Sequence, residues 1–314
     1  MEGSLDSADL ARDDRGRSDC FTPLGFAMTK KQMKMNKQEV IASLNKIDIK
    51  PNRMRGQNFL VDEKVLQTII ETSGAGRGST VVEVGPGLGV LTEALLKAGA
   101  RVIALEQERQ FVEYLRKKFD GSPLSVLAGN AVLKIPELKL PPEYAVVSNL
   151  PYSITSPVIN LFLTRVSPRP MSLTLMVQGE VAERLTAPVG SSKRGILTVL
   201  IEMLGSARLV ARVSPASFYP SPKVESAVIR IDIGRQTSDV EETEKVMRVV
   251  KAGFSKRRAQ IRNALKLGLK LDVADVNRIL SESNIDPTLR AEDLTANNWQ
   301  VLARAYYQTS SIVE

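Results

Sequence analysis

The sequence predicts an α/β fold in which a mostly parallel, doubly wound sheet is followed by a small helical C-terminal domain. From about residue 40 to residue 234, short apolar runs alternate with longer amphipathic segments, as in β-α-β units. Beyond Gly234 the strand patterns stop and the apolar spacing becomes helical. A glycine cluster directly follows the apolar run at 80–84, which is typical of a sheet that binds a nucleotide-like ligand at its carboxyl edge.

Each expected strand is a short apolar run bounded by glycine, proline or polar residues. Strands are expected at 80–84, 101–105, 124–128, 144–148 and 172–177, with helices at 63–71, 88–97, 108–119 and 155–165. Two later strands are expected at 209–213 and 224–232, and the prolines at 215, 220 and 222 exclude regular structure between them. Helices are expected from Val240 onward, with breaks near Gly268 and Pro287.

These patterns divide the chain into three parts. Residues 1–33 mix Asp, Arg, Ser and Gly with little periodicity, so a disordered tail is expected there. Residues 34–235 carry the α/β pattern, and residues 236–314 carry the helical one. The tail lacks the apolar region of a signal peptide, its aspartates argue against a transit peptide, and no apolar run is long enough to span a membrane. We therefore expect a cytoplasmic protein with no membrane partner, and a monomer.

Two residue types are absent or nearly absent, and their absence excludes several kinds of chemistry. The chain has no histidine, which excludes Ser-His-Asp and Cys-His nucleophile systems and every zinc site with histidine ligands. Its one cysteine, Cys20, excludes a disulfide framework and a cysteine-rich zinc site, so no metal site is expected. The net charge of +8 favours polyanionic partners, although a mildly basic solvated surface explains the same number.

The glycine cluster Gly85-Pro86-Gly87-Leu88-Gly89 has the spacing G-x-G-x-G. A dinucleotide fingerprint has its third glycine one residue later, so a dehydrogenase is the least favoured reading. The observed spacing is typical of Rossmann-like class I methyltransferases. Glu106 ends the next expected strand, where a carboxylate can accept hydrogen bonds from both ribose hydroxyls of a nucleoside cofactor. Gly85, Gly87 and Glu106 are therefore candidate cofactor residues, and the alternative is a glycine-rich turn beside an ordinary surface glutamate.

Asn149, Leu150, Pro151 and Tyr152 follow the strand expected at 144–148 and suit methylation of an adenine amino group. That nitrogen is a poor nucleophile because its lone pair is delocalised into the ring. The side-chain oxygen of Asn149 and the carbonyl of Leu150 can each accept one N–H, which frees the lone pair, while Pro151 fixes the turn. Tyr152 offers a ring on which an extruded base can stack. Positioning and hydrogen bonding then suffice without a histidine base, whereas an isolated motif of this kind is more often a simple turn.

A basic stretch in the expected helical domain is a candidate RNA-binding surface. Residues 251–270 contain seven Lys or Arg and no acidic residue. The members at helical spacing are Lys256, Arg257, Arg258, Arg262 and Lys266. Their clustering on one face would suit phosphate contacts, so residues 236–314 are expected to bind RNA, and the alternative is a solvated helix face. Arg184, Lys193 and Arg194 are weaker candidates for contacts near the active face.

Taken together, the motifs resemble the ribosomal RNA adenine N6,N6-dimethyltransferase family. The markers are Gly56 to Leu60 followed by Asp62, Glu83 to Gly87, Glu106, Asn149 to Tyr152, Phe218 to Val224 with Ser226 to Val228, and Arg257 to Asn263. The resemblance implies S-adenosyl-L-methionine as cofactor. It also implies dimethylation of two adjacent adenosines near the 3′ end of 16S ribosomal RNA, with the immature small ribosomal subunit as partner.

The resemblance also implies roles for individual residues. Asn58 and Leu60 would line the cofactor site, Gly85 would lie against the methionine part of the cofactor, and Glu106 would hold its ribose. Asn149 would touch both cofactor and target base. Phe218 would sit in the loop that closes over the base.

One position departs from the family pattern. Asn130 follows the strand expected at 124–128, where the family usually has an aspartate that accepts a hydrogen bond from the adenine amino group of the cofactor. An asparagine oxygen can accept that bond without the charge. A non-catalytic RNA-binding assembly factor therefore stays an alternative. So does the related large-subunit rRNA methyltransferase of macrolide resistance, although those enzymes commonly carry phenylalanine at the position of Tyr152.

Overall fold

The computed structural model describes residues 36–51, 57–234, 240–256 and 258–310. The predicted disordered tail at 1–33, Gly56 and Arg257 lie outside these residues. Among the described residues, no helix is both long and apolar enough to cross a membrane.

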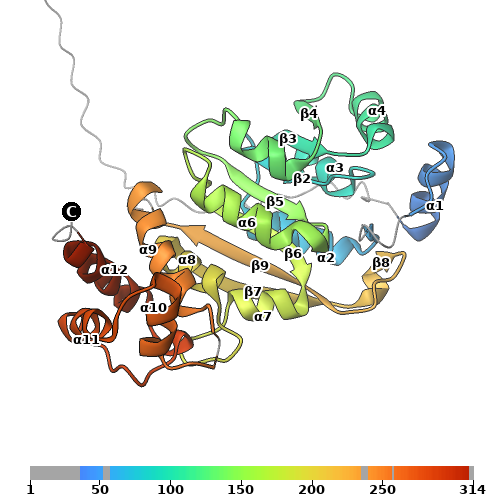
Figure 1. Ribbon diagram of the computed structural model, residues 1–314. Coiled ribbons are helices and arrows are strands. Elements are labelled where there is room, and N and C mark those ends of the chain that lie inside the picture. The colour runs from blue at the N-terminus through green and yellow to red at the C-terminus, as the bar shows by residue number, and fades with distance from the viewer. Residues whose placement is uncertain (1–35, 52–56, 235–239, 257, 311–314) are drawn as a thin grey trace, which may run out of the picture. The chain divides into compact units, whose positions relative to one another are not determined.

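A seven-stranded sheet in the order β4-β3-β2-β5-β6-β9-β7 forms the centre of the fold (Figure 1). Its strands are β2 (Thr80–Val84), β3 (Arg101–Glu106), β4 (Leu124–Ala128), β5 (Ala145–Asn149), β6 (Ser172–Gln178), β7 (Gly205–Val213) and β9 (Ser226–Ile233). The five strands from β4 to β6 are parallel, and β9 is antiparallel to both β6 and β7. The prediction of a mostly parallel sheet is confirmed, and β2 and β4 have the predicted bounds.

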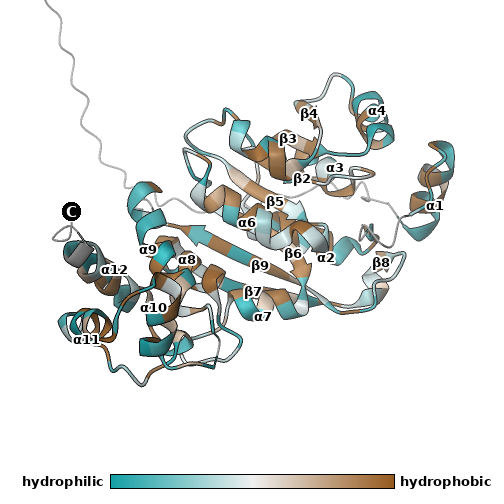
Figure 2. Cartoon of the chain, viewed as in Figure 1, coloured by the Kyte–Doolittle hydropathy of each residue, from teal (hydrophilic) through white to brown (hydrophobic). Residues whose placement is uncertain are grey.

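Both faces of the sheet are covered by helices. Successive side chains along a strand point to opposite faces, so a strand that is apolar throughout needs a helical layer on each face. Val81 packs in one buried cluster with α2 (Glu63–Ser73) and α3 (Val90–Lys97). Val82 packs in another with α6 (Thr155–Thr164), α7 (Gly179–Leu185) and α8 (Ile196–Leu204). Figure 2 shows β3 and β5 in the apolar colour, as expected for strands that are buried between two layers of helices.

Helices α4 (Arg109–Lys118) and α5 (Ala131–Lys134) follow β3 and β4, and α1 (Lys37–Lys46) precedes the sheet. The N-cap of α2 is Asp62, whose side chain accepts the N–H of Lys64 at 3.0 Å, as helix starts require. The helices α1, α5, α7 and α8 were not among the predicted elements.

The C-terminal helices are α9 (Val240–Gly253), α10 (Ile261–Leu269), α11 (Val273–Glu282) and α12 (Ala296–Ser310). Their buried side chains, including Val250 and Trp299, belong to the same hydrophobic cluster as Phe162 of α6 and Ile231 of β9. The helical region therefore shares a core with the sheet, and its division from the sheet at residues 235 and 236 stays a prediction from composition.

The predicted helix break near Gly268 is confirmed, because α10 ends at Leu269 and α11 begins at Val273, although Gly268 itself lies inside α10. A Cβ atom at Gly268 would lie 2.6 Å from the Cα of Ala252. The glycine therefore allows α10 to pack closely against α9. The break itself follows at Lys270, which has a left-handed conformation with φ of 58°.

The prediction that prolines exclude regular structure between residues 213 and 224 is wrong in part. Pro215–Ser217 form a 3-10 turn, and β8 (Phe218–Tyr219) pairs antiparallel with β1 (Phe59–Leu60). The prolines flank β8 without interrupting its two paired residues. The distant segments around residues 59 and 218 consequently lie side by side.

Candidate active site

The strands β2 and β5 are neighbours in the sheet although β3 and β4 come between them in the sequence. The strand order therefore reverses at this point: β3 and β4 extend the sheet on one side of β2, and β5 and β6 extend it on the other. At such a switch point the loops after the two strands diverge and leave a crevice at the carboxyl edge. A cavity of about 350 Å³ lies there, within the size range of small-molecule sites. Its lining includes the expected residues Asn58, Leu60, Gly85, Gly87, Glu106, Asn149, Leu150, Pro151 and Tyr152.

The glycine loop leaves β2 with backbone angles that favour glycine. Gly85 and Gly87 have φ of 71° and 54°. A Cβ at Gly85 would lie 3.2 Å from the Pro151 side chain, and one at Gly87 would lie 3.1 Å from the Phe59 ring. The two positions thus combine backbone geometry with close approach, and a side chain at either would intrude on the cavity wall.

Glu106 sits at the end of β3 beneath the glycine loop and is 6 % exposed. Its Oε2 accepts the N–H of Gly87 at 3.0 Å, and its Oε1 accepts the N–H of Glu108 at 2.9 Å. Burial raises the pKa of this carboxyl, and the backbone N–H groups oppose that rise. Each carboxylate oxygen has a second lone pair, so Glu106 keeps acceptor capacity for two ribose hydroxyls.

Glu83 is a buried carboxyl in the cavity wall to which the sequence reasoning gave no role. Its Oε2 accepts the hydroxyl of Thr92 at 2.6 Å, and burial raises its pKa to about 8. The negative charge of Glu106 adds to that rise. Only its position in the strand before the glycines hinted at this environment, because its burial depends on α3 packing over β2.

The Asn149-Leu150-Pro151-Tyr152 segment is held in place from several sides. The side-chain Nδ2 of Asn149 donates to the carbonyl of Asn58 at 3.3 Å, which orients the amide so that Oδ1 is left to accept. The N–H of Leu150 donates to the carbonyl of Met176 in β6 at 3.2 Å. Pro151 packs against Gly85, so the segment touches the glycine loop. These contacts fix the backbone of the segment and the orientation of the Asn149 amide, and the role of Asn149 Oδ1 and the Leu150 carbonyl as acceptors stays a prediction.

Tyr152 is tied to the far strand β9. Its hydroxyl lies 2.7 Å from Oγ of Ser226, a fully buried residue at the start of that strand. Burial raises the pKa of Tyr152, and the contact with Ser226 opposes that rise. The ring itself is half-buried and lines the cavity. This hydrogen bond joins residues 74 positions apart, and sequence reasoning missed it.

Phe218 lies elsewhere than expected. It is 4 % exposed, pairs with Leu60 through β8, and packs in the cluster that contains Ile69 and Val147. It therefore lies in a short strand at the core, not in an open loop, and it does not line the cavity. The reason is the pairing of β8 with β1, which the prolines concealed. A role for Phe218 near the base stays a prediction.

Asn130 is exposed and does not line the cavity. Its Oδ1 accepts the N–H of Val132 at 2.9 Å and thereby caps α5. The side-chain oxygen expected to meet the cofactor thus already has a partner.

The basic candidates at residues 256–266 that the structure describes are all exposed: Lys256, Arg258, Arg262 and Lys266. They lie on α10 and on the turn before it, so they face solvent together with the exposed Lys251 and Lys270. Arg194, in contrast, is 1 % exposed. The weak expectation that it meets RNA is wrong, because its guanidinium is paired internally with Glu202.

A glycine loop after β2, a carboxylate at the end of β3, and an antiparallel strand inserted between the last two strands of an otherwise parallel sheet define a class I methyltransferase. The family model for "Ribosomal RNA adenine dimethylase" matches residues 49–306. The chain belongs to this family, whose enzymes use S-adenosyl-L-methionine.

Similar proteins agree with this assignment. The chain is 35 % identical over 268 residues to ribosomal RNA small subunit methyltransferase A of Alkaliphilus oremlandii, covering 83 % of this chain and 93 % of that protein. It is 40 % identical over 255 residues to the protein of the same name from Sphingopyxis alaskensis, covering 80 % and 92 %.

Two solved structures share the fold. A dimethyladenosine transferase from Plasmodium falciparum aligns with a TM-score of 0.68 at 22 % identity, covering 80 % of this chain and 98 % of that one. The 23S rRNA methyltransferase ErmE aligns with a TM-score of 0.60 at 27 % identity, covering 79 % and 99 %. The C-terminal helices are part of the shared architecture, as these coverages require.

Proposed function

We propose that this chain transfers methyl groups from S-adenosyl-L-methionine to N6 of adenosines in 16S rRNA of the small ribosomal subunit, during ribosome assembly. The observation that carries the proposal is the Asn149-to-Tyr152 segment, held against the glycine loop at the edge of a cofactor-sized cavity. The small-subunit relatives at 35 % and 40 % identity support the choice of substrate. When bound, the cofactor supplies an electrophilic methyl group.

Different residues around the cavity would bind the cofactor, activate the adenine amino group and hold the base. Glu106 would accept hydrogen bonds from the ribose of the cofactor, and Gly85 and Gly87 would let the cofactor approach the backbone. Asn149 Oδ1 and the Leu150 carbonyl would each accept one N–H of the adenine amino group, which localises its lone pair. The Tyr152 ring would stack against the extruded base. No residue needs to remove a proton before transfer, because the nitrogen becomes acidic only after it gains the methyl group.

The main alternative is methylation of large-subunit rRNA. ErmE shares the fold, but at lower identity than the small-subunit relatives. The Tyr152 hydroxyl, anchored on Ser226, supports the small-subunit assignment because the resistance enzymes commonly carry phenylalanine there.

The direct test incubates the protein with radiolabelled S-adenosyl-L-methionine and ribosomal subunits that lack the modification. Label in dimethyladenosine of 16S rRNA is expected, and label only in large-subunit RNA contradicts the proposal. Tight subunit binding without any label would instead identify a non-catalytic assembly factor.

The Asn149→Ala variant tests the chemical role directly. Loss of one preorganised hydrogen-bonding group in a catalytic site reduces kcat by about 100- to 1,000-fold. We expect a fall in kcat of that size with little change in affinity for the subunit. Single-turnover methylation gives the rate, and filter binding gives the affinity. Near-normal turnover by this variant would show that Asn149 does not activate the amino group.

A further inference from the structure

A second cavity, of about 360 Å³, opens beside the active site. It is formed by the first turn of α6, the end of α7, the start of α8 and the residue that follows α9. These contribute Ser156, Arg184, residues 195–198 and Phe254. Its lining side chains are mostly apolar, apart from the hydroxyls of Ser156 and Thr198 and the guanidinium of Arg184. The charged side chain in this lining is therefore a cation.

The two cavities are neighbours along the chain. Ile154 lines the catalytic cavity and Ser156 lines the second one. Two residues span at most about 7 Å, so the linings approach each other within the length of one nucleotide unit. A strand whose target base enters the first cavity would therefore carry its next nucleotide past the second.

Arg184 is built into the second cavity. The hydroxyl of Thr198, which is 2 % exposed, donates to the Arg184 carbonyl at 2.7 Å and fixes the end of α7 against α8. One guanidinium nitrogen of Arg184 donates to Oγ of Ser156 at 3.2 Å. Within the described part of the chain, no carboxylate forms an ion pair with Arg184, and Glu180 one turn earlier is exposed.

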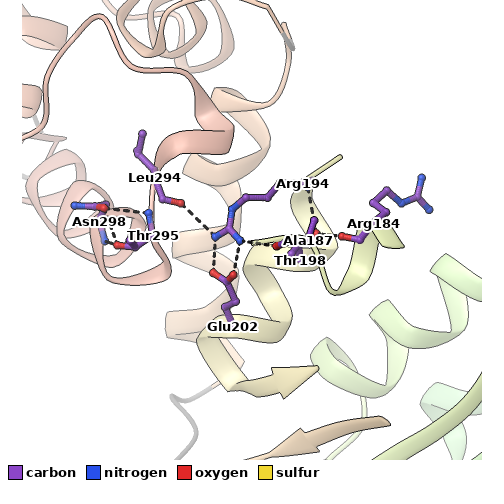
Figure 3. A network of polar contacts seen from close by, with 9 residues as sticks. Arg184, Ala187, Arg194, Thr198, Glu202, Leu294, Thr295 and Asn298 are labelled. Carbon is purple, nitrogen blue, oxygen red and sulfur yellow. Dashed lines mark hydrogen bonds and ion pairs between the residues drawn. The ribbon is translucent and has the colours of Figure 1, made fainter. Parts of the chain in front are cut away.

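The nearby basic residues differ from Arg184 in this respect. Both terminal nitrogens of Arg194 contact the Glu202 carboxylate, and one also donates to the Leu294 carbonyl at 3.2 Å. Lys193 pairs with Glu183 at 2.5 Å. Figure 3 shows the contrast, because the Arg184 side chain points away from the network around Arg194. Arg194 thus serves the structure, and Arg184 keeps its charge and most of its N–H donors for a ligand.

We propose that the second cavity binds the sugar-phosphate unit of the nucleotide next to the target adenosine, with Arg184 pairing to its phosphate. This inference rests on the proposed function. A guanidinium presents paired N–H donors that match phosphate oxygens, and phosphate contacts fix the register of a nucleic acid on a protein. The site also continues into the exposed basic stretch, since Phe254 lines it and Lys256 and Arg258 follow two and four residues later. The bound strand would run from Tyr152 past Arg184 to that stretch.

The test compares Arg184→Gln and Arg184→Lys with the wild-type protein. Removing one charged contact raises the KM for small subunits about tenfold or more and leaves kcat unchanged, because the contact serves binding alone. It also makes binding less sensitive to salt, lowering the slope of log affinity against log salt by about 0.7 for a single strand. Arg184→Lys keeps the charge and is expected to keep the wild-type slope. A merely structural role of Arg184 would not change the slope.

Arg165→Gln is the matched control. Arg165 follows the other end of α6 and pairs with Glu244 at 2.9 Å, so its loss removes the same charge away from the proposed path. For Arg165→Gln, the slope of log affinity against log salt and the KM for small subunits are expected to equal those of the wild type. If the wild type methylates subunits and Arg184→Gln matches it in slope and KM, the second site is refuted while the proposed function stands. If the wild type itself fails to methylate subunits, the proposed function fails.

Discussion

Removing the hydroxyl of Tyr152 tests whether the base-stacking ring depends on its anchor in β9. In the structure this hydroxyl and Oγ of Ser226 lie 2.7 Å apart. Tyr152→Phe keeps the ring and deletes the hydroxyl, whereas Ser226→Ala deletes the anchor and keeps the hydroxyl. The two single variants and the double variant form a complete thermodynamic cycle.

The burial of the two partners predicts unequal losses of stability. Ser226 is 0 % exposed, so Tyr152→Phe leaves a buried hydroxyl without its partner and costs about 1–3 kcal/mol. Tyr152 is half-buried and its hydroxyl can turn to water, so Ser226→Ala costs only about 0.5–1.5 kcal/mol. The double variant removes both groups and is expected to cost less than the sum, with a coupling free energy of about 1 kcal/mol.

Urea denaturation gives the free energies of unfolding, and single-turnover methylation gives the rates. A Tyr152 ring without its hydrogen bond to Ser226 spends less time in the stacking position. Both single variants are therefore expected to lose about five- to tenfold in kcat, which corresponds to the coupling free energy of about 1 kcal/mol. Tyr144→Phe is the matched control. It deletes another buried tyrosine hydroxyl, which donates to the Pro168 carbonyl at 3.0 Å before β5 begins, at the opposite edge of the sheet. It is expected to lower stability without lowering kcat.

Additive losses would refute this reasoning. If the double variant loses the sum of the two single losses to within about 0.5 kcal/mol, the two hydroxyls are energetically independent. An equal fall in kcat for Tyr144→Phe would show that kcat follows general stability and that the anchor has no special role in catalysis.

Two further predictions concern the cofactor side of the cavity. Asn130→Asp supplies a second acceptor oxygen beside the one that caps α5 at Val132, so we expect the Kd for S-adenosyl-L-methionine to fall about five- to tenfold by calorimetry. An unchanged Kd would mean that this side chain makes no contact with the cofactor. Glu83 holds its proton up to a pKa of about 8, whereas the unfolded chain releases it near 4.5, so wild-type stability should fall as pH rises from 5 to 8. Glu83→Gln should lack that part of the decline, and parallel urea profiles for both proteins would contradict the burial argument.

The contiguous parts of the fold and site could be predicted from the sequence. Strands β2 and β4 were predicted to the residue because glycine or proline bounds each apolar run. The glycine loop and the segment from Asn149 to Tyr152 were each predicted to follow a strand of a mostly parallel sheet, and they lie together in the structure because the carboxyl ends of such strands share one edge. The confirmed family and fold depend on these contiguous signals.

What the sequence could not predict depends on contacts between distant segments. The Tyr152–Ser226 hydrogen bond requires β9 to lie beside β6, and the burial of Glu83 requires α3 to pack over β2. Arg184 and Arg194 are equivalent in a list of basic residues. They differ because Glu202 on α8 neutralises only Arg194. The same applies to Gly268, a helix breaker by type whose missing side chain here admits a neighbouring helix.

The order of the strands implies a division of labour across the carboxyl edge of the sheet. Glu106 ends β3 and Asn130 follows β4 on one side of β2, whereas Tyr152 and Arg184 follow β5 and β6 on the other. Ser226 opens the antiparallel β9 opposite the end of β6, so it joins the second group. Substitutions in the first group should change the Kd for the cofactor, and those in the second should change the KM for RNA or kcat. The two groups meet where Gly85 touches Pro151, so this contact joins the side of the cavity expected to hold the cofactor to the side expected to receive the base.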